Sequence, residues 1–182
     1  MPTLSSLLGE EPQALRYYLQ EGADDALTLR RATIVVSLLG IAAMAATTLL
    51  QTGVVKNLPD PPRGNFHTRQ VNSSPEAYSY GGPDSPIAIT THGVNMVLAS
   101  MGGWDRPARH PWLPLLATLF AGAQAVTAAR YLFWQMPKVD KAWCPYCIVD
   151  ALTHFATVGL TLPESRAALR RVLSQRTLRG ES

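Results

Sequence analysis

Four long uncharged stretches alternate with shorter polar segments along this chain of 182 residues. The stretches cover residues 32–55, 85–104, 110–129 and 142–162, and only Asp150 interrupts the last of them. A helix needs about 20 mostly apolar residues to cross a bilayer, whereas an amphipathic helix of a soluble bundle carries a regular charged stripe. The pattern therefore predicts an all-α fold, an integral membrane four-helix bundle. We place its helices at about 30–52, 86–103, 111–134 and 143–162.

The second stretch is the most polar of the four, and its polarity affects how we expect it to pack. Its polar side chains are Thr90, Thr91, His92 and Asn95. Polar side chains of membrane helices commonly hydrogen-bond across to neighbouring helices. We therefore expect this helix to face its neighbours, with His92 and Asn95 either in interhelical bonds or in contact with a ligand.

Two polar segments flank the predicted membrane domain, which covers residues 30–162. Residues 1–29 are expected to be a cytoplasmic segment containing a short helix that ends near Gly22. Residues 163–182 form a basic amphipathic tail, which is suited to an anionic lipid surface.

The longest connection, residues 53–85, contains many turn-forming residues, among them Pro59-Asp60-Pro61-Pro62 and Gly81-Gly82-Pro83-Asp84. Loops of this length are uncommon unless they have a role. Tyr78 and Tyr80 give this loop apolar surface of its own. We expect it to fold down as an outer-side cap over the ends of the helices.

The formal net charge of +3 does not require a nucleic-acid partner, because the basic residues have a topological use. With the N-terminus in the cytoplasm, most of them fall on the inner side, as the positive-inside rule expects. The inner set is Arg30, Arg31, Arg106, Arg109, Arg166, Arg170, Arg171, Arg176 and Arg179, and the outer set is Lys56, Arg63, Arg69, Lys138 and Lys141. The sequence therefore predicts a multi-pass protein of a bacterial inner membrane, with both termini cytoplasmic.

The two cysteines of the chain, Cys144 and Cys147, open the fourth helix on the predicted periplasmic side. Their spacing at a helix start allows the two sulfurs to form a disulfide. A helix N-terminus stabilises a thiolate through its dipole and its free N–H groups, and Pro145 fits the first turn because its missing N–H costs nothing there. Thiol–disulfide chemistry persists in the oxidising periplasm. The cysteine pair is therefore the candidate catalytic site.

Other interpretations of this motif fit less well. A structural zinc site needs four ligands and the sequence has no second cysteine pair, so no metal is expected. Covalently attached haem needs a histidine after the second cysteine, where Ile148 stands. The tetrapeptide also occurs in glutaredoxins, but that fold needs a βαβ unit where this chain has apolar helices. A membrane dithiol that exchanges electrons with a lipid-soluble quinone is what remains.

Two charged residues lie inside the predicted membrane helices. Asp150 follows Cys147 by three residues, and Arg130 is the basic residue of the third helix at a matching depth. A carboxylate within a membrane usually has a partner or marks a pathway. We therefore expect a supporting charge pair between Arg130 and Asp150, the alternative being an Arg130 that extends toward the membrane surface. His154, on the same helix face as Cys147, is expected to pack or hydrogen-bond in the core.

In these features the sequence resembles the vitamin K epoxide reductase family. The features are four membrane helices, both termini inside, a long outer loop between the first two helices, and a Cys-x-x-Cys motif that opens the fourth. The passage from Asn72 to Ser85 is similar to a cysteine-poor bacterial branch. The resemblance implies a bundle around a quinone pocket for non-covalent ubiquinone or menaquinone. It also implies that Cys147 faces the quinone and that Cys144 exchanges with a second thiol pair.

A polar residue near the start of the second helix contacts the quinone in this family. Asp84, Ser85 and His92 stand near that place, and with Asn95, Tyr78 and Tyr80 they make up the candidate quinone-binding set. Well-known members also carry a second cysteine pair in the outer loop, and residues 53–85 have none. Either an external, periplasmic thioredoxin-like protein then reaches Cys144 directly, or the disulfide activity is lost.

The sequence therefore favours a membrane thiol–disulfide oxidoreductase that couples the Cys144/Cys147 dithiol at the outer face to a quinone. The alternative is a non-catalytic accessory subunit of a larger membrane complex, built on the same scaffold, because the outer loop lacks cysteines. Both functions place the chain in contact with membrane lipid, and neither involves nucleic acid.

Overall fold

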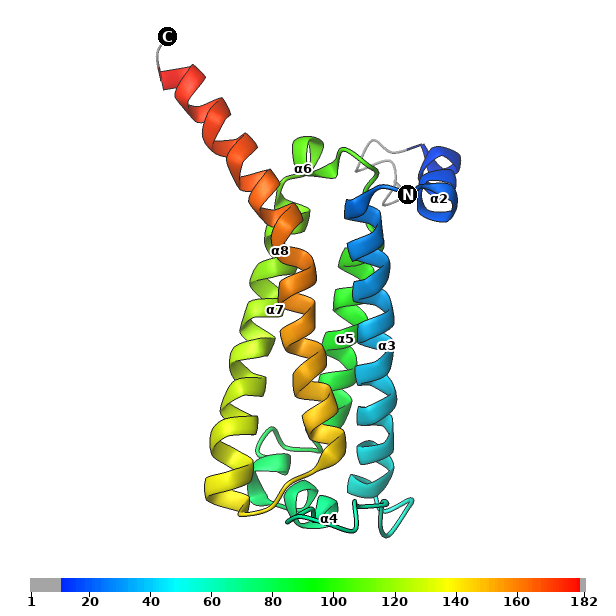
Figure 1. Ribbon diagram of the computed structural model, residues 1–182, viewed down its shortest axis with the longest axis vertical. Helices are drawn as coiled ribbons and strands as arrows, with labels where there is room; N and C mark the ends of the chain where they lie inside the picture. The colour runs from blue at the N-terminus through cyan, green and yellow to red at the C-terminus, as the bar shows by residue number, and fades with distance from the viewer. Residues whose placement is uncertain (1–10, 181–182) are drawn as a thin grey trace.

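Helices make up most of residues 11–180, the part of the chain that the computed structural model describes, with side chains described through residue 175; no strand forms within it. Four long helices lie side by side along the molecule (Figure 1). They are α3 (Asp25–Gln51), α5 (Ser85–Ser100), α7 (Trp112–Arg130) and α8 (Pro145–Gly180). The shorter elements are α2 (Pro12–Glu21), α4 (Thr68–Asn72), η1 (Pro75–Tyr78), α6 (Arg106–Arg109) and η2 (Tyr131–Asp140). The all-α prediction is confirmed for this part of the chain.

The first long helix begins earlier than expected, at Asp25, because Asp24 caps it. The Asp24 carboxylate accepts a hydrogen bond from the Leu27 N–H at 2.9 Å, which satisfies one of the free donors of the first turn. The preceding helix, α2, ends at Gly22 as the sequence predicts. The first ten residues of the predicted N-terminal segment lie outside the described part of the chain.

The third and fourth long helices both run further than the sequence indicates. α7 continues without a break into η2, whose wider π-helical turns extend to Asp140 around Pro137. α8 continues through Pro163, where we expected the fourth helix to end, and reaches Gly180. A proline inside a helix removes one backbone hydrogen bond and bends the helix without having to end it. The C-terminal part of α8 leans away from the bundle (Figure 1).

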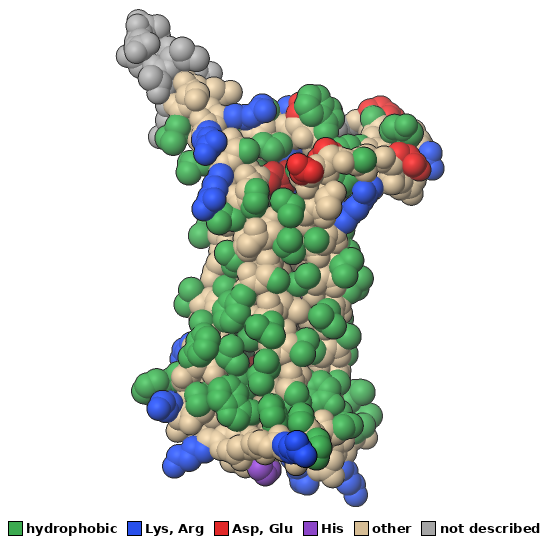
Figure 2. All heavy atoms as spheres, viewed as in Figure 1, with side chains coloured by type: hydrophobic (Ala, Val, Ile, Leu, Met, Phe, Trp, Pro, Cys, Tyr) green, Lys and Arg blue, Asp and Glu red, His purple; other side chains and the backbone are tan. Residues whose placement is uncertain are grey.

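Polar side chains lie inside the bundle and large apolar side chains lie on its outer surface. The buried polar set includes Ser37, Thr47, His92, Asn95, Gln124 and Thr157. The exposed apolar set includes Val35 and Leu39 on α3, Val97 on α5, Leu119 and Val126 on α7 and Leu152 on α8. Charged side chains gather at the two ends of the molecule and are scarce across the middle of the face seen in Figure 2. This distribution is typical of helices surrounded by lipid, where apolar side chains face the hydrocarbon and polar side chains bond to one another inside. In water, so many exposed apolar side chains would be unfavourable.

Two of the described helical segments are long and apolar enough to cross a membrane by length and composition alone. They are Asp25–Gln51 and Trp112–Asp140. At 16 residues, α5 is shorter than the length that usually spans a bilayer. α8 is long enough, but its C-terminal half carries several arginines.

The connection between α3 and α5, which contains α4 and η1, folds across one end of the bundle (Figure 1). It is fastened to the segment before α8, since the His67 N–H donates to the Trp143 carbonyl at 2.9 Å and the Gln70 amide donates to the Asp140 carbonyl at 2.7 Å. Asp60 caps α4 by accepting from the Thr68 N–H and hydroxyl. The predicted cap therefore forms, and it lies against the segment that carries the cysteines.

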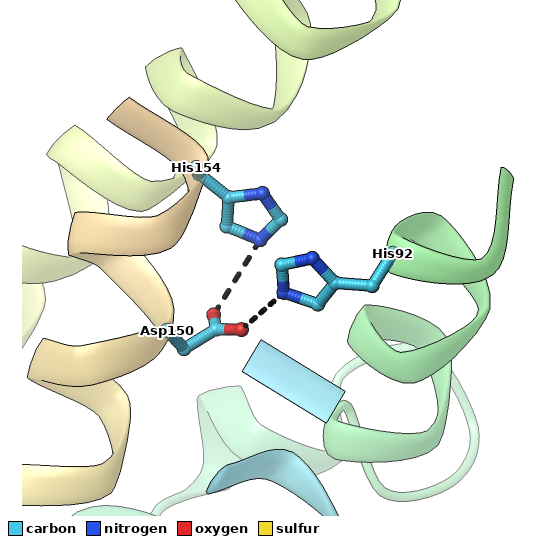
Figure 3. Close-up of side chains that lie close together, drawn as sticks. All are labelled: His92, Asp150 and His154. Atoms are coloured by element: carbon cyan, nitrogen blue, oxygen red, sulfur yellow. Dashed lines mark hydrogen bonds and ion pairs between the residues drawn. The ribbon is translucent and has the colours of Figure 1, made fainter. Parts of the chain in front are cut away.

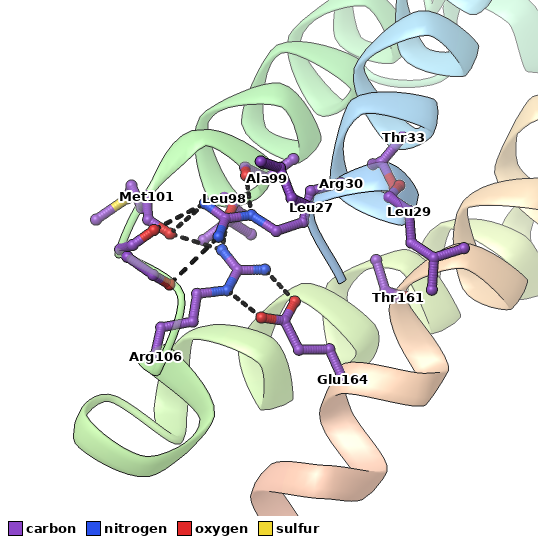
Figure 4. A network of polar contacts seen from close by, with 12 residues as sticks. Leu27, Leu29, Arg30, Thr33, Leu98, Ala99, Met101, Arg106, Thr161 and Glu164 are labelled. Atoms are coloured by element: carbon purple, nitrogen blue, oxygen red, sulfur yellow. Dashed lines mark hydrogen bonds and ion pairs between the residues drawn. The ribbon is translucent and has the colours of Figure 1, made fainter. Parts of the chain in front are cut away.

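At the opposite end of the bundle, Arg30 and Arg106 are buried, with 4% and 2% of their surface exposed. Arg30 donates to the carbonyls of Ala99, Met101 and Gly102 at the end of α5. Arg106 donates to the Leu98 and Met101 carbonyls and forms a bidentate ion pair with Glu164 on α8 (Figure 4). Two arginines of the predicted inner set are therefore buried and hold helices together.

Candidate functional site

The candidate site is built around a disulfide at the start of α8. Cys144 lies just before the helix and Cys147 in its first turn, and their sulfurs are bonded to each other. The Cys147 N–H, one of the free donors of that turn, points at the Cys144 sulfur at 3.2 Å. Cys144 is completely buried, whereas Cys147 retains 8% of its surface and borders a cavity. The two sulfurs therefore have different environments.

Asn72, at the end of α4, connects the cap to the disulfide. Its side-chain amide donates to the Cys144 sulfur at 3.3 Å and to the Cys147 sulfur at 3.6 Å, and it also donates to the Thr68 carbonyl within α4. Asn72 is buried, with 2% of its surface exposed. The apolar neighbours that close the rest of the disulfide surroundings include Val71, Met136 and Ala142. An N–H donor at sulfur favours negative charge there, so Asn72 can stabilise a thiolate when the disulfide is reduced.

A cavity of about 400 Å³ opens between the four long helices beside Cys147. Pockets for small organic ligands have volumes of about 300–1,000 Å³ and combine apolar walls with a few polar groups. Apolar walls come from Met44, Ile87, Ala88, Ala123, Ala128 and Ala151. Polar groups come from Asn72, Glu76, Asp84, Ser85, Arg130, Tyr131, Gln135, Asp150 and His154. The cavity has the size and lining to hold a flat ring with carbonyl oxygens.

The structure brings only part of the predicted quinone-binding set to this cavity. Tyr80, Asp84 and Ser85 line it together with Cys147. Tyr78 does not line it, because its hydroxyl donates to the Gln51 carbonyl at 2.9 Å and fastens η1 to the end of α3.

The other two members of the predicted set, His92 and Asn95, are also absent from the cavity wall. Asn95 on α5 exchanges two hydrogen bonds with Gln124 on α7, at 2.9 and 3.2 Å. This amide pair is the interhelical alternative that the sequence left open. His92 lies deeper in the bundle, where it contacts Asp150.

Asp84 joins the end of α3 to the start of α5 at the rim of the cavity. Its carboxylate accepts from the Gln51 side-chain amide at 2.7 Å, and the Oε1 atom of the same Gln51 side chain accepts from the Ser85 N–H. Burial raises the pKa of the Asp84 carboxyl above its usual value, and the Gln51 hydrogen bond offsets part of that effect. The rim therefore holds a carboxyl group whose ionisation is disfavoured.

The predicted pair between Arg130 and Asp150 is replaced by a different arrangement. Both residues line the cavity, but among the described residues the ion-pair partners of Asp150 are two histidines. His92 Nε2 lies 2.9 Å from Asp150 Oδ1, and His154 Nε2 lies 3.5 Å from Asp150 Oδ2 (Figure 3). The imidazoles reach into the bundle core, whereas Arg130 is exposed at its edge.

Sequence reasoning missed both Asn72 and the grouping of these three side chains. Asp150 and His154 stand four residues apart, a spacing that places them on one helix face, so their contact was open to inference. The position of His92 depends on Gly40 in α3, because a Cβ atom at residue 40 would overlap the His92 ring. Asn72 had no comparable signal, since only the folded cap places it at the sulfurs.

Comparison with known proteins agrees with this geometry. The sequence profile described as the vitamin K epoxide reductase family matches residues 31–162, which include the long connection, the cysteine pair and the first half of α8. The chain therefore belongs to the vitamin K epoxide reductase family. Membership implies a membrane oxidoreductase whose thiol–disulfide chemistry is linked to a quinone, and the two apolar helices agree with a membrane location. Searches among curated proteins and among solved structures found no match.

Proposed function

We propose that this chain transfers two electrons between the Cys144/Cys147 pair and a quinone that occupies the cavity beside Cys147. The observation that carries the proposal is the difference between the two sulfurs. Cys147 borders a cavity of about 400 Å³, while Cys144 is sealed beneath the cap. Cys147 is then the sulfur that faces the quinone, and Cys144 is the sulfur that exchanges with an outside thiol.

The overall reaction balances without any other redox group. Two thiols lose two electrons and two protons and become a disulfide, and the quinone gains both and becomes a hydroquinone. In this reaction Asn72 holds both sulfurs by hydrogen bonds and stabilises the thiolate. The first turn of α8 adds its N–H groups to the same task. Tyr80, Asp84 and Ser85 line the ring site and position its oxygens.

We further propose that all four long helices cross the membrane, with both chain ends on the cytoplasmic side and the disulfide on the periplasmic side. The exposed apolar side chains on α3, α5, α7 and α8 support this arrangement. α2 and the C-terminal part of α8 lie at one end of the bundle and the cap lies at the other (Figure 1). Arg31, Arg166 and Arg170 belong to the first end, in keeping with the positive-inside rule.

The test is quinone reduction by the purified full-length chain in detergent, with dithiothreitol as the thiol donor and a short-chain ubiquinone analogue as the acceptor. Cys147→Ala is expected to abolish turnover, because the sulfur that faces the cavity is removed. Ser174→Ala, an exposed change near the far end of α8, is the control and should behave like the wild type. Unchanged turnover in Cys147→Ala would overturn the proposal.

A non-catalytic accessory subunit is the second candidate, and the burial of Cys144 is the observation that favours it. An outside thiol can reach the Cys144 sulfur only after the cap moves, because the described residues leave none of its surface exposed. Gentle solubilisation followed by native mass analysis separates the two functions. A stable complex with other chains and no thiol-dependent turnover would favour the subunit, and a lone active species would exclude it.

A further inference from the structure

His92, Asp150 and His154 form a buried three-residue cluster beside the proposed quinone cavity (Figure 3). His92 comes from α5, and the other two come from α8. The carboxylate lies between the two Nε2 atoms, and the histidines are only 0% and 5% exposed. Nδ1 of each imidazole is buried and lacks a hydrogen-bond partner among the described residues. A cluster with this composition either binds a metal ion or holds protons.

The arrangement of the two rings argues against a metal ion. Their centroids lie 4.4 Å apart and their planes are within 5° of parallel, so the imidazoles are stacked face to face. A metal ion binds the imidazole lone pair, which lies in the plane of the ring. Lone pairs in two parallel, stacked planes cannot converge on one ion. The unpartnered Nδ1 atoms are a second argument against a metal ion, because histidines that bind a metal usually donate their other N–H to a fixed acceptor.

The charges of the cluster favour a single shared proton. An ionised carboxylate flanked by two neutral imidazoles leaves one net negative charge inside the bundle, which is unfavourable in an apolar surrounding. Protonation of both stacked imidazoles would place two positive charges against each other. One added proton makes the cluster neutral, and it can reside on either histidine or on the carboxylate. Asp150 and His154, the two members that border the cavity, are where this proton can enter or leave.

The cluster lies where the quinone reaction needs protons. Cys147, Asp150 and His154 are spaced three and four residues apart, so they follow one face of α8, and all three border the cavity. His92 is the inner member, held behind Asp150. The other titratable or charged groups around the cavity are Glu76 on η1, Tyr80 and Asp84 before α5, and Arg130 and Tyr131 at the α7–η2 junction. The wall contributed by α3 is Met44.

We propose that the His92–Asp150–His154 cluster carries protons between the cysteine thiols and the quinone oxygens. This inference rests on the proposed function. In each turnover the dithiol gives two electrons to the quinone and becomes the disulfide. The cluster accepts a thiol proton and releases a proton to a quinone oxygen, twice, and ends with the proton count at which it began.

The test compares Asp150→Asn with Asp150→Glu in the full-length protein, using the dithiothreitol and ubiquinone-analogue assay. Asparagine keeps the size of the side chain but cannot carry a proton, so kcat should fall about 100-fold or more, as for loss of a general acid–base group. The KM for the quinone should not change. Reduction of the Cys144–Cys147 disulfide by dithiothreitol alone, without quinone, should also proceed at the wild-type rate. Glutamate retains a proton-carrying group and should keep most of the turnover.

A second pair of variants moves His92 without changing any polar group. Gly40→Ala places a methyl group against the His92 ring, whereas Gly93→Ala, beside His92 on α5, meets open space. Gly40→Ala should lower kcat and alter its dependence on pH, because the displaced ring no longer reaches Asp150. Gly93→Ala should leave both unchanged.

The outcomes separate the two proposals. If the wild type does not reduce the quinone, the proposed function fails and the proton role fails with it. If the wild type is active and Asp150→Asn keeps its kcat and pH profile, only the proton role is overturned. Stoichiometric Zn²⁺ binding by the wild type that is lost in Asp150→Asn would also overturn it, in favour of a metal site. Loss of kcat in Asp150→Asn with unchanged KM and unchanged disulfide reduction supports it.

Discussion

The side-chain amide of Asn72 donates to the sulfur of Cys144 at 3.3 Å, although 72 residues separate the two in the sequence. This contact crosses from the cap to the start of α8, and the same amide reaches the Cys147 sulfur. The position of the cap and the chemistry of the cysteines are therefore linked through one side chain.

Asn72→Ala should slow the reaction of the reduced cysteines with an alkylating reagent at neutral pH by about tenfold. A hydrogen bond to a charged group contributes about 1.5–3 kcal/mol, and its loss lowers the fraction of thiolate. The rate of iodoacetamide labelling measures the effect. Gln70→Ala is the matched control, since Gln70 fastens the same segment to the Asp140 carbonyl and does not contact sulfur. Equal or faster labelling in both variants would show that Asn72 acts only by holding the cap.

Asp60→Ala should expose Cys144. Asp60 caps α4 through the Thr68 N–H and hydroxyl, and loss of a helix cap costs about 1 kcal/mol. The open form of the cap should then be about five times more populated, and Cys144 of the reduced protein should be labelled correspondingly faster in mass spectrometry of the digested chain. Asp24→Ala removes a comparable cap from α3 at the opposite end of the bundle. An equal gain of Cys144 labelling in Asp24→Ala would contradict local opening.

Arg106→Met should lower the stability of the folded protein by about 3 kcal/mol, because it leaves the Glu164 carboxylate buried without its partner. It also removes the donors to the Leu98 and Met101 carbonyls. Thermal unfolding in detergent measures the change. The double variant Arg106→Met with Glu164→Leu should recover part of the loss, since no unpaired charge remains. Arg166→Ala, an exposed neighbour on α8, should change the melting temperature little.

Asp84→Asn should stabilise the protein at neutral pH and have little effect in acid. Burial raises the pKa of Asp84 in the folded state, so the folded protein favours the neutral carboxyl. The neutral Asp84 carboxyl therefore contributes its full stability below the usual pKa of aspartate. That contribution is lost as the pH rises through the raised pKa of the folded state. Asparagine stays neutral and still accepts the Gln51 hydrogen bond. Melting temperatures measured across this pH range, with the exposed Glu21→Gln as a charge-matched control, test the sign.

Much of the architecture could be predicted because it depends on local patterns. Four uncharged stretches predicted the four long helices, and turn-forming residues located the long connection. The predicted end of the fourth helix was wrong, since α8 continues through Pro163 to Gly180. The continuation of α7 to Asp140 was also missed, because a π-helical segment has no simple sequence period.

The site was less accessible to sequence reasoning because its contacts join distant segments. The cysteine pair was found from its spacing. The partner of Asp150 was not found, because it lies on another helix. His92 of α5 reaches Asp150 of α8 only through the space left by Gly40 of α3. Arg30 and Arg106 were assigned to the inner side from the charge pattern, and only the packed structure shows them buried and bound to carbonyls. Tertiary contacts of this kind depend on which helix faces are adjacent.

The arginines at the end of α5 have a consequence for how deep that helix sits. Its 16 residues extend about 24 Å, less than the roughly 30 Å of a hydrocarbon layer. In the membrane arrangement proposed above, its last carbonyls would end below the aqueous boundary, where water cannot satisfy them. Arg30 and Arg106 supply the missing donors from neighbouring segments. In that arrangement the two guanidinium groups would replace interfacial water, and a helix too short to cross alone could end inside the protein.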